Sequence, residues 1–284
     1  MNLRDAIRIE GLRKTYKDFS LEIPSLTLPG GCILGLIGEN GAGKTTTIRL
    51  LLDLIRRDEG EITVLGEMVG TKGYEAVKED IGVVFDEPGF PPALTGKEIG
   101  RILRYTYKRW DSGVYEKLTE QFGLPMHKKF SEYSKGMKMK LAIVAALSHN
   151  PKLLILDEAT SGLDPVVRDE ILDIFMDFTR AEDHSILVSS HIVSDLEKLC
   201  DYVAFLHGGK LLLWEEKDRL AERYGVIQCM EEEIADYGDA VKGRRITPYG
   251  AQILVDRTML ADAPEIMPVG VEDLFVYLVK EERR

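Results

Sequence analysis

A short glycine-rich segment between an apolar run and a helical pattern constrains the fold of this chain more than any other feature. The segment GENGAGKTT at 38–46 follows the apolar run CILGLI and precedes IRLLLDLI, whose apolar residues recur at helical spacing. It matches G-x-x-x-x-G-K-[ST], in which glycines let backbone N–H groups surround phosphates and the next helix presents its positive N-terminal end. The combination predicts a strand, a phosphate-binding loop and a helix at the centre of an α/β fold.

This loop contains most of the residues that we expect to bind a nucleotide. Lys44 would reach the β- and γ-phosphates, and the Thr45 hydroxyl would bind magnesium. The alternative is a glycine-containing strand–helix turn that contains a lysine by chance. The expected nucleotide-binding residues of the loop are Gly38, Glu39, Asn40, Gly41, Ala42, Gly43, Lys44, Thr45 and Thr46.

Polar side chains follow two further apolar strands. LLIL at 153–156 ends in Asp157 and Glu158, and open α/β sheets bind ligands at the carboxyl ends of their strands. Asp157 should therefore meet magnesium directly or through a water, and Glu158 should orient and deprotonate the attacking water. Alternatively, the two carboxylates simply begin the next loop. His191 follows SILVSS and could donate a hydrogen bond to the γ-phosphate, although a histidine at a strand end is more often structural.

With these motifs in this order, the chain resembles the ATP-binding subunits of ABC transporters from residue 7 to about 225. Tyr16 lies where that family has its adenine-stacking aromatic, 38–46 matches Walker A, and 153–158 matches Walker B with its catalytic glutamate. The remaining matches are the signature (Tyr133, Ser134, Lys135, Gly136, Met137), the D-loop (Ser161, Gly162, Leu163, Asp164) and the switch histidine (His191). The resemblance implies that ATP and Mg²⁺ lie between two head-to-tail domains, each ATP contacting one domain's Walker A and the other's signature. A lone chain would then be inactive.

The signature departs from the family's usual LSGGQ, because Lys135 replaces a glycine and Met137 replaces the glutamine. Ser134 precedes a predicted helix, so its hydroxyl and the free N–H groups of the first turn form an anion site. Ser134 and Met137 cannot close the reciprocal capping box that Ser and Gln would form. Because Ser134 and Gly136 are retained, we expect the contact with a partner's γ-phosphate to remain, with Lys135 adding positive charge nearby.

A second departure lies at 81–95, which corresponds to the family's Q-loop. Asp86 stands at the position of the expected glutamine, and an ionised aspartate only accepts hydrogen bonds, whereas an amide also donates them. Either Asp86 takes over the magnesium contact, which we favour because carboxylates bind magnesium well, or it lies further from the metal. Glu87 is the neighbouring alternative. The expected metal ligands are Thr45, Asp86 and Asp157.

Composition limits the classes of partner. The 284 residues include 37 Lys and Arg against 48 Asp and Glu, a formal net charge of −11. Such a chain is poorly suited to following nucleic-acid phosphates, so no nucleic-acid partner is expected. No apolar run approaches the roughly 18 residues of a membrane helix, and MNLRDAIRIEGLRK at the start lacks the apolar core of a signal peptide. Three scattered cysteines without CxxC spacing suit a reducing cytoplasm.

The predicted fold is an α/β P-loop NTPase core with a parallel sheet, an antiparallel β subdomain, an inserted α-helical subdomain and a small α+β C-terminal appendage. Residues 7–31 alternate as antiparallel strands, and HGGK at 207–210 indicates a hairpin turn. Thr95 and Glu98 form a capping box that opens a helix running to Trp110.

We place the nucleotide-binding domain at 1–225, with its helical subdomain at about 95–150. Residues 226–284 form a predicted accessory domain of two or three strands and a terminal helix. A disordered tail is the alternative, but the apolar periodicity of ILV at 253–255 and of 274–279 argues against it.

The resemblance implies an ATP-hydrolysing subunit on the cytoplasmic, inner face of the cell membrane. It would drive export through separate membrane-spanning subunits, together with an identical or related second nucleotide-binding subunit. The overall form resembles Gram-positive exporters of antimicrobial peptides, bacteriocins or phenol-soluble modulins, so the expected cargo is a peptide or antibiotic. The membrane subunit should dock near 86–95, where we expect an exposed apolar cluster of Phe90, Pro91, Pro92 and Leu94.

Two other functions fit less well. A soluble ABC-type ATPase acting on DNA or ribosomes should resemble members with a long inserted coiled coil or with two cassettes, and this chain has one cassette. A P-loop GTPase should contain the guanine-reading pattern N-K-x-D, which this sequence lacks.

Overall fold

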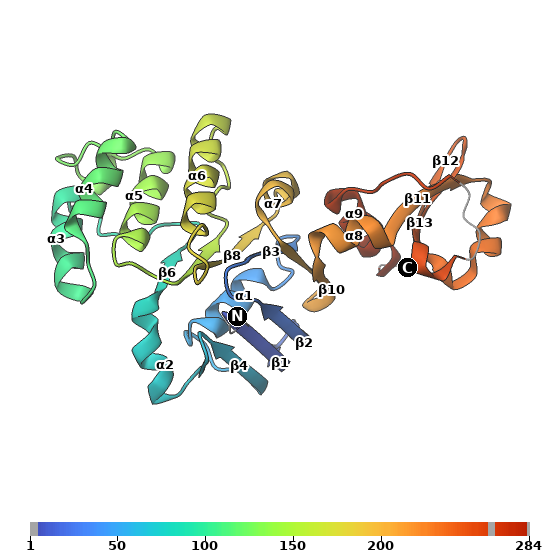
Figure 1. Cartoon of the computed structure of the whole chain (residues 1–284), viewed down its shortest axis with the longest axis horizontal. Helices are drawn as coiled ribbons and strands as arrows, with labels where there is room; N and C mark the ends of the chain where they lie inside the picture. The colour runs from blue at the N-terminus through green and yellow to red at the C-terminus, as the bar shows by residue number, and fades with distance from the viewer. Residues whose placement is uncertain (1–4, 261–264, 283–284) are drawn as a thin grey trace.

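The computed structural model describes residues 5–260 and 265–282, which contain a large and a small β-sheet. In the large sheet, ten strands follow the order β5-β4-β1-β2-β10-β9-β3-β8-β7-β6 (Figure 1). These strands are β1 (Ile7–Thr15), β2 (Ser20–Leu28), β3 (Ile33–Gly38), β4 (Glu59–Val64), β5 (Glu67–Met68), β6 (Ile81–Val84), β7 (Leu153–Asp157), β8 (Ser185–Ser190), β9 (Tyr202–His207) and β10 (Lys210–Glu216). The predicted α/β class is confirmed.

Five neighbouring strands, β9, β3, β8, β7 and β6, run parallel and form the core. Every residue of β3, β7 and β8 is buried, as expected for strands that are rich in Leu, Ile and Val and covered on both faces. Ile37 pairs with Ser190, and Asp157 pairs with Ser189. The carboxyl ends of these three strands therefore lie side by side, where the phosphate-loop, carboxylate and histidine motifs begin.

The other half of the large sheet is antiparallel, as predicted for residues 7–31. It joins the core because β2 pairs in parallel with β10 through a single residue pair, Glu22 and Lys210. β10 forms the predicted hairpin with β9. At its turn Gly209 has φ +82, and a Cβ there would lie 1.9 Å from the Ser20 carbonyl oxygen. Only glycine lets the two backbones approach this closely.

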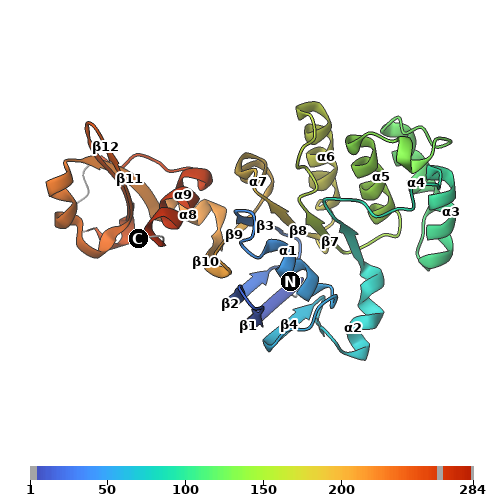
Figure 2. The same ribbon diagram turned by 180° about the vertical axis from the view of Figure 1, so that it is seen from behind.

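Helices cover both faces and one end of the large sheet (Figures 1 and 2). They are α1 (Lys44–Leu51), α2 (Lys72–Val77), α3 (Gly96–Thr106), α4 (Ser112–Gln121), α5 (Lys135–Leu147), α6 (Pro165–Phe178), α7 (Val193–Leu199), α8 (Lys217–Arg223) and α9 (Val271–Glu282). The group α3, α4 and α5 forms the predicted helical subdomain beyond the β6 edge (Figure 1).

Helix α3 begins as predicted but ends earlier. The Thr95 and Glu98 side chains close the predicted capping box at its start. The helix stops at Thr106 instead of continuing to Trp110, because the carboxylate of Glu79 accepts hydrogen bonds from the backbone amides of the residues that follow Tyr107. A contact from a distant segment thus replaces the next helical turn.

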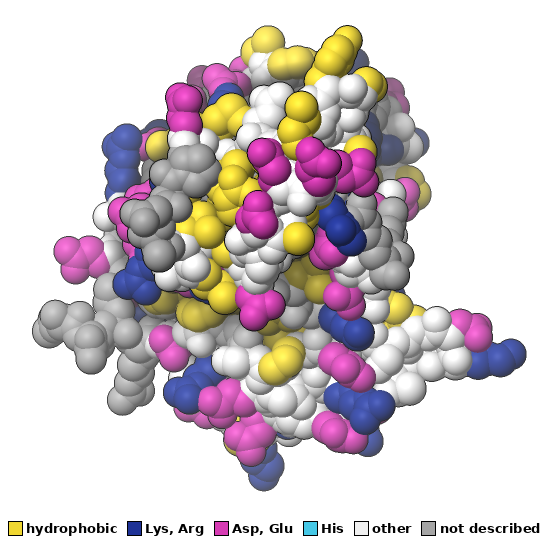
Figure 3. Space-filling model, turned by 90° about the vertical axis from the view of Figure 1, so that its right-hand side faces the viewer, with side chains coloured by type: hydrophobic (Ala, Val, Ile, Leu, Met, Phe, Trp, Pro, Cys, Tyr) yellow, Lys and Arg dark blue, Asp and Glu magenta, His cyan; other side chains and the backbone are white. Residues whose placement is uncertain are grey.

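The C-terminal part has its own sheet, in the order β11 (Tyr224–Cys229), β13 (Gly250–Asp256) and β12 (Val241–Thr247). A 3₁₀ segment, Glu231–Ala240, packs on β12 and β13, and α9 packs on β12. The predicted strands and terminal helix are therefore present. This part lies at the opposite end of the molecule from α3–α5 (Figure 2), and hydrophobic, acidic and basic side chains are interspersed on its surface (Figure 3).

An ion pair between a partly exposed arginine, Arg223, and a buried carboxylate, Asp256, connects α8 to this small sheet. The Asp256 residue is 1% exposed, and its carboxylate accepts hydrogen bonds from Arg223 Nε at 2.8 Å and from the Thr258 amide at 3.0 Å. Burial alone would raise the pKa of Asp256, but the bonds from Arg223 and Thr258 hold its pKa below the usual range. The carboxylate therefore stays charged inside the fold.

Candidate nucleotide-binding site

The predicted phosphate loop lines a cavity of about 470 Å³. Gly41 and Gly43 have φ +83 and +111, which favour glycine, and a Cβ on Gly38 would lie 2.6 Å from the Leu206 carbonyl oxygen. Gly38 and Ala42 are buried and do not line this cavity. The lining residues are Phe19, Glu39, Asn40, Gly41, Gly43, Lys44, Thr45, Thr46, Asp86 and Glu158.

Lys44 is held at this cavity by three oxygens. Its Nζ donates to the Gly38 carbonyl at 2.7 Å and to the Glu39 carbonyl at 3.4 Å. Its Nζ also lies 3.1 Å from Glu158 Oε1, and the two side chains are 6% and 15% exposed. A phosphate that binds Lys44 must therefore compete with the Glu158 carboxylate for the same ammonium. The phosphate contact itself stays a prediction.

Thr45 and Asp157, both predicted as metal ligands, are in direct contact. Thr45 Oγ1 donates to Asp157 Oδ2 at 2.9 Å, and Ser189 Oγ donates to Asp157 Oδ1 at 2.6 Å. A hydroxyl and a carboxylate are oxygen ligands that magnesium prefers, so the pair fits that ion. Within residues 5–260 and 265–282, no three His, Cys, Asp or Glu side chains are grouped as a metal site. Phosphate or water oxygens would have to complete the coordination.

Glu158 adopts an unusual backbone conformation beside Asp157. Its φ is +53, and its N–H lies 3.1 Å from the Ser189 carbonyl oxygen. Successive residues in a strand point to opposite faces of the sheet. Because the backbone leaves the strand conformation at Glu158, both carboxylates can reach the phosphate loop. Glu158 Oε2 also lies 2.7 Å from His191 Nδ1. The structure thus brings together Lys44, Asp157, Glu158 and His191, as the order of the motifs predicted.

Tyr16 lies in the turn between β1 and β2, next to this cavity but outside its lining. Tyr16 is 44% exposed. Its ring centroid lies 6.3 Å from that of Phe19, which does line the cavity. Asp58 fixes the turn by accepting hydrogen bonds from Lys14 Nζ at 2.9 Å and from the Thr15 amide at 2.7 Å. These bonds lower the pKa of Asp58. Lys14 Nζ also lies 5.6 Å from the Tyr16 ring centroid.

The signature and D-loop residues adjoin each other in the same chain. Ser134 caps α5 by accepting a hydrogen bond from the Met137 amide at 3.2 Å. The Lys135 side chain extends over Gly162, where a Cβ would lie 2.7 Å from Lys135 Nζ. A hollow of about 300 Å³ is lined by residues of both motifs, including Ser134, Lys135, Gly136, Met137, Gly162, Leu163 and Asp164.

Asp86 is exposed and lines the phosphate-loop cavity together with Lys44 and Thr45. Its Oδ1 accepts a hydrogen bond from the Glu87 amide at 2.9 Å. Asp86 and Glu87 also line a neighbouring hollow of about 670 Å³, which Lys135, Ser161 and His191 help to form. The contact between Asp86 and magnesium stays a prediction.

The expectation of an exposed apolar cluster at 90–94 was partly wrong. Pro91 and Pro92 are exposed, but Phe90 and Leu94 are half-buried. The Phe90 ring packs edge-on against Phe130, with centroids 5.6 Å apart. Phe90 therefore contributes to packing between the segment 85–90 and the helical subdomain.

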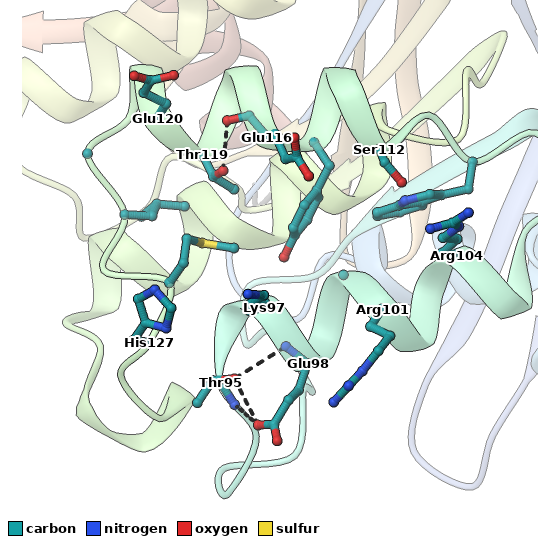
Figure 4. Close-up of a pocket in the computed structure, with 16 residues that line it drawn as sticks. Thr95, Lys97, Glu98, Arg101, Arg104, Ser112, Glu116, Thr119, Glu120 and His127 are labelled. Atoms are coloured by element: carbon teal, nitrogen blue, oxygen red, sulfur yellow. Dashed lines mark hydrogen bonds between the residues drawn. The ribbon is translucent and has the colours of Figure 1, made fainter.

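A hollow of about 970 Å³, larger than the phosphate-loop cavity, lies between α3 and α4 and shares no lining residue with that cavity. Figure 4 shows Lys97, Arg101 and Arg104 on α3, and Glu116 and Glu120 on α4, among the residues that line this hollow. None of the predicted nucleotide or metal ligands lines it. Size alone would therefore have selected the wrong hollow.

Sequence reasoning missed Phe19 and Ser189. Phe19 packs on the phosphate loop, since a Cβ on Gly43 would lie 3.3 Å from Phe19 Cζ. Ser189 contacts the carboxylate of Asp157 and the backbone N–H of Glu158. A polar residue near the carboxyl end of a buried strand is a usable signal for Ser189, whereas no local pattern singles out Phe19.

Comparison with known proteins identifies the family. Residues 21–161 match the family described as ABC transporter. The ABC transporter ATP-binding protein YtrB of Bacillus subtilis (strain 168) is 36% identical over 204 residues, 72% of this chain and 69% of YtrB. The bacitracin transport ATP-binding protein BcrA of Bacillus licheniformis is 36% identical over 238 residues, 83% of this chain and 77% of BcrA. The lantibiotic transport ATP-binding protein SrtF of Streptococcus pyogenes is 33% identical over 215 residues, 75% of this chain and 91% of SrtF.

A solved structure described as an ATP binding subunit of an ABC transporter has TM-score 0.69 and 29% identity, covering 76% of this chain and 92% of that chain. The chain belongs to the ABC transporter family, as an ATP-binding, ATP-hydrolysing subunit. This confirms the resemblance and the predicted ATPase activity. In the described part of the chain, no helix has the length and apolar character needed to cross a membrane.

Proposed function

We propose that this chain hydrolyses ATP-Mg²⁺ between two nucleotide-binding subunits packed head to tail and thereby drives export of a peptide or antibiotic through separate membrane-spanning subunits. The second subunit is a copy of this chain or a related one, and the complex acts at the inner face of the cell membrane. The relatives whose names refer to bacitracin and lantibiotic transport support this class of cargo.

The position of the Glu158 carboxylate is the observation that carries the proposal. One oxygen lies 3.1 Å from Lys44 Nζ and the other lies 2.7 Å from His191 Nδ1, beside the phosphate-loop cavity. Phosphates that bind Lys44 would release Glu158, which could then accept a proton from water. A ring nitrogen of His191 would then donate a hydrogen bond to the γ-phosphate. Magnesium, bound by Thr45 and Asp157, would neutralise charge on the phosphates.

The separation of the two motifs supports a second subunit. Ser134 and Gly136 do not line the phosphate-loop cavity of their own chain, although they belong to the nucleotide site that the family resemblance implies. Ser134 is exposed at the start of α5, where the first-turn N–H groups can accept an anion. A partner's γ-phosphate would supply that anion in a head-to-tail pair.

For the membrane subunit we propose a groove of about 270 Å³ between β6 and the helices α3 and α5. Its lining is mainly apolar and includes Phe90, Leu103, Tyr107 and Ala142. The segment 85–90 borders this groove and also supplies Asp86 to the phosphate-loop cavity. One short segment would therefore connect the membrane partner with the nucleotide.

We also propose that 1–225 forms the nucleotide-binding domain, with its helical subdomain at about 95–150, and that 226–284 forms an accessory domain. The separate sheet that begins at Tyr224, and one cluster of buried apolar residues confined to this part, support this division.

Transport in inside-out vesicles tests the proposal. The chain would be reconstituted with the membrane protein that co-purifies with it, and ATP-dependent uptake of labelled bacitracin and of a labelled lantibiotic would be measured. We expect uptake of at least one peptide with the wild-type chain and none with Glu158→Gln. ATP hydrolysis without a membrane partner and without uptake of either peptide would contradict the exporter function.

A further inference from the structure

A buried serine contacts both acidic residues of the site, Asp157 through its carboxylate and Glu158 through its backbone. Ser189 is 0% exposed and pairs with Asp157 across the parallel strands β7 and β8. Its hydroxyl donates to Asp157 Oδ1 at 2.6 Å. Its carbonyl oxygen and its Oγ lie 3.1 and 3.2 Å from the Glu158 nitrogen. One side chain that does not line the phosphate-loop cavity thus contacts the Asp157 carboxylate and the Glu158 backbone N–H.

Because of the bond from Ser189, the two carboxylate oxygens of Asp157 have different partners. Ser189 occupies Oδ1, and Oδ2 faces Thr45 Oγ1 at 2.9 Å. The terminal torsion of an aspartate is broad and roughly two-fold, so it does not hold the carboxylate plane by itself. The Ser189 hydroxyl, fixed on the neighbouring strand, holds the carboxylate plane of Asp157. The same bond satisfies a buried acceptor, Oδ1, which would cost free energy if it were left without a donor. Oδ2 is therefore the oxygen left for a metal beside Thr45.

The bonds to Glu158 act on the backbone. A non-glycine residue with φ +53 is uncommon and strained, and it persists when its surroundings fix it. Because the Ser189 hydroxyl donates its hydrogen to Asp157, an Oγ lone pair can accept the Glu158 N–H, in addition to the backbone carbonyl. The same hydroxyl thus helps to hold the positive-φ backbone conformation that brings the Glu158 side chain to Lys44.

We propose that Ser189 is a positioning residue that orients Asp157 toward the magnesium of the bound nucleotide and Glu158 toward the attacking water. The inference rests on the proposed function for the roles of the metal and the water. Ser190 provides a contrast, because it is also buried but its Oγ accepts a hydrogen bond from the Ile192 amide at 2.9 Å. Alternation along the strand directs it away from Asp157.

The test compares Ser189→Ala and Ser189→Cys with the matched control Ser190→Ala. ATP affinity is measured by calorimetry in EDTA and at increasing Mg²⁺, and the Mg²⁺ concentration at half-maximal ATP turnover is recorded. Loss of a hydrogen bond to a charged group should raise the Mg²⁺ midpoint about tenfold. Affinity in EDTA should stay within about twofold, and Ser190→Ala should keep the wild-type midpoint.

Ser189→Cys distinguishes positioning from packing, because a thiol nearly fills the same space but is a weak donor. If its Mg²⁺ midpoint equals that of wild type, Ser189 only fills space and the proposal is wrong. A midpoint that rises equally in Ser190→Ala would also overturn it. If wild type binds ATP with a Mg²⁺-dependent affinity but drives no transport, the exporter function fails while the binding test of Ser189 stands.

Discussion

Replacing Glu158 by glutamine should tighten ATP binding while nearly stopping hydrolysis. Glu158 Oε1 lies 3.1 Å from Lys44 Nζ, so phosphates must displace a carboxylate from the ammonium they bind. At that separation two unit charges attract by about 1.3 kcal/mol in bulk water and about 5 kcal/mol at an effective dielectric constant of about 20. The displaced carboxylate keeps His191 as a partner, so we use the lower value, which corresponds to about tenfold tighter binding. Because an amide cannot act as a base, turnover should fall roughly 10²- to 10⁴-fold.

Calorimetric titration with ATP, in EDTA and then with Mg²⁺, measures the affinity, and phosphate release measures turnover. Glu87→Gln is the matched control, since Glu87 lines the neighbouring hollow but not the phosphate-loop cavity. Weaker ATP binding by Glu158→Gln, or equal tightening in Glu87→Gln, would refute the competition between Glu158 and phosphate. Turnover above a tenth of wild type would remove Glu158 as the base.

Two further predictions concern Asp86 and the C-terminal part. If Asp86 binds the metal, Asp86→Ala should raise the Mg²⁺ requirement of turnover and leave ATP binding in EDTA intact, while Asp86→Gln keeps substantial activity; Mg²⁺ curves identical to wild type for Asp86→Ala would exclude the ligand role. Asp256→Asn should lower the free energy of unfolding by about 2 kcal/mol at pH 7, because it removes the ionic partner of Arg223. The folded-state pKa of Asp256 is depressed, so its contribution is complete above about pH 4 and is lost as the pH falls below that value. Urea unfolding at pH 7 and at about pH 3 should show the difference between variant and wild type shrinking, and a constant difference would argue against the ion pair.

The core of the fold could be predicted from the sequence because its apolar runs match the burial that central parallel strands require. The runs that became β3, β7 and β8 are apolar throughout, which suits strands buried on both faces. The carboxyl ends of parallel strands meet at one edge of a sheet, so the grouping of Lys44, Asp157 and Glu158 could be predicted from the motifs that follow these strands.

What the sequence did not predict depends on contacts between distant segments. Ser189 reads as part of an apolar strand, and only the register of β7 against β8 places it beside Asp157. Glu79 ends α3 early from outside the helical pattern. Phe90 lies in a proline-rich loop that reads as exposed, yet Phe130 provides a partner for its ring. In each case a tertiary contact overrides the local pattern.

The antiparallel and parallel halves of the large sheet are joined by a single residue pair between β2 and β10, and a bound nucleotide would contact both halves. Few backbone hydrogen bonds cross this boundary, and one cluster of buried apolar residues packs against both halves of the sheet, so the halves are joined mainly by side-chain packing. Tyr16 belongs to the antiparallel half and Lys44 belongs to the parallel one. A ligand that contacts both residues would stabilise the boundary by mass action, in proportion to its concentration relative to its dissociation constant. The local stability of the sheet would then report nucleotide occupancy, and slower amide hydrogen exchange along β2 and β10 would be its signature.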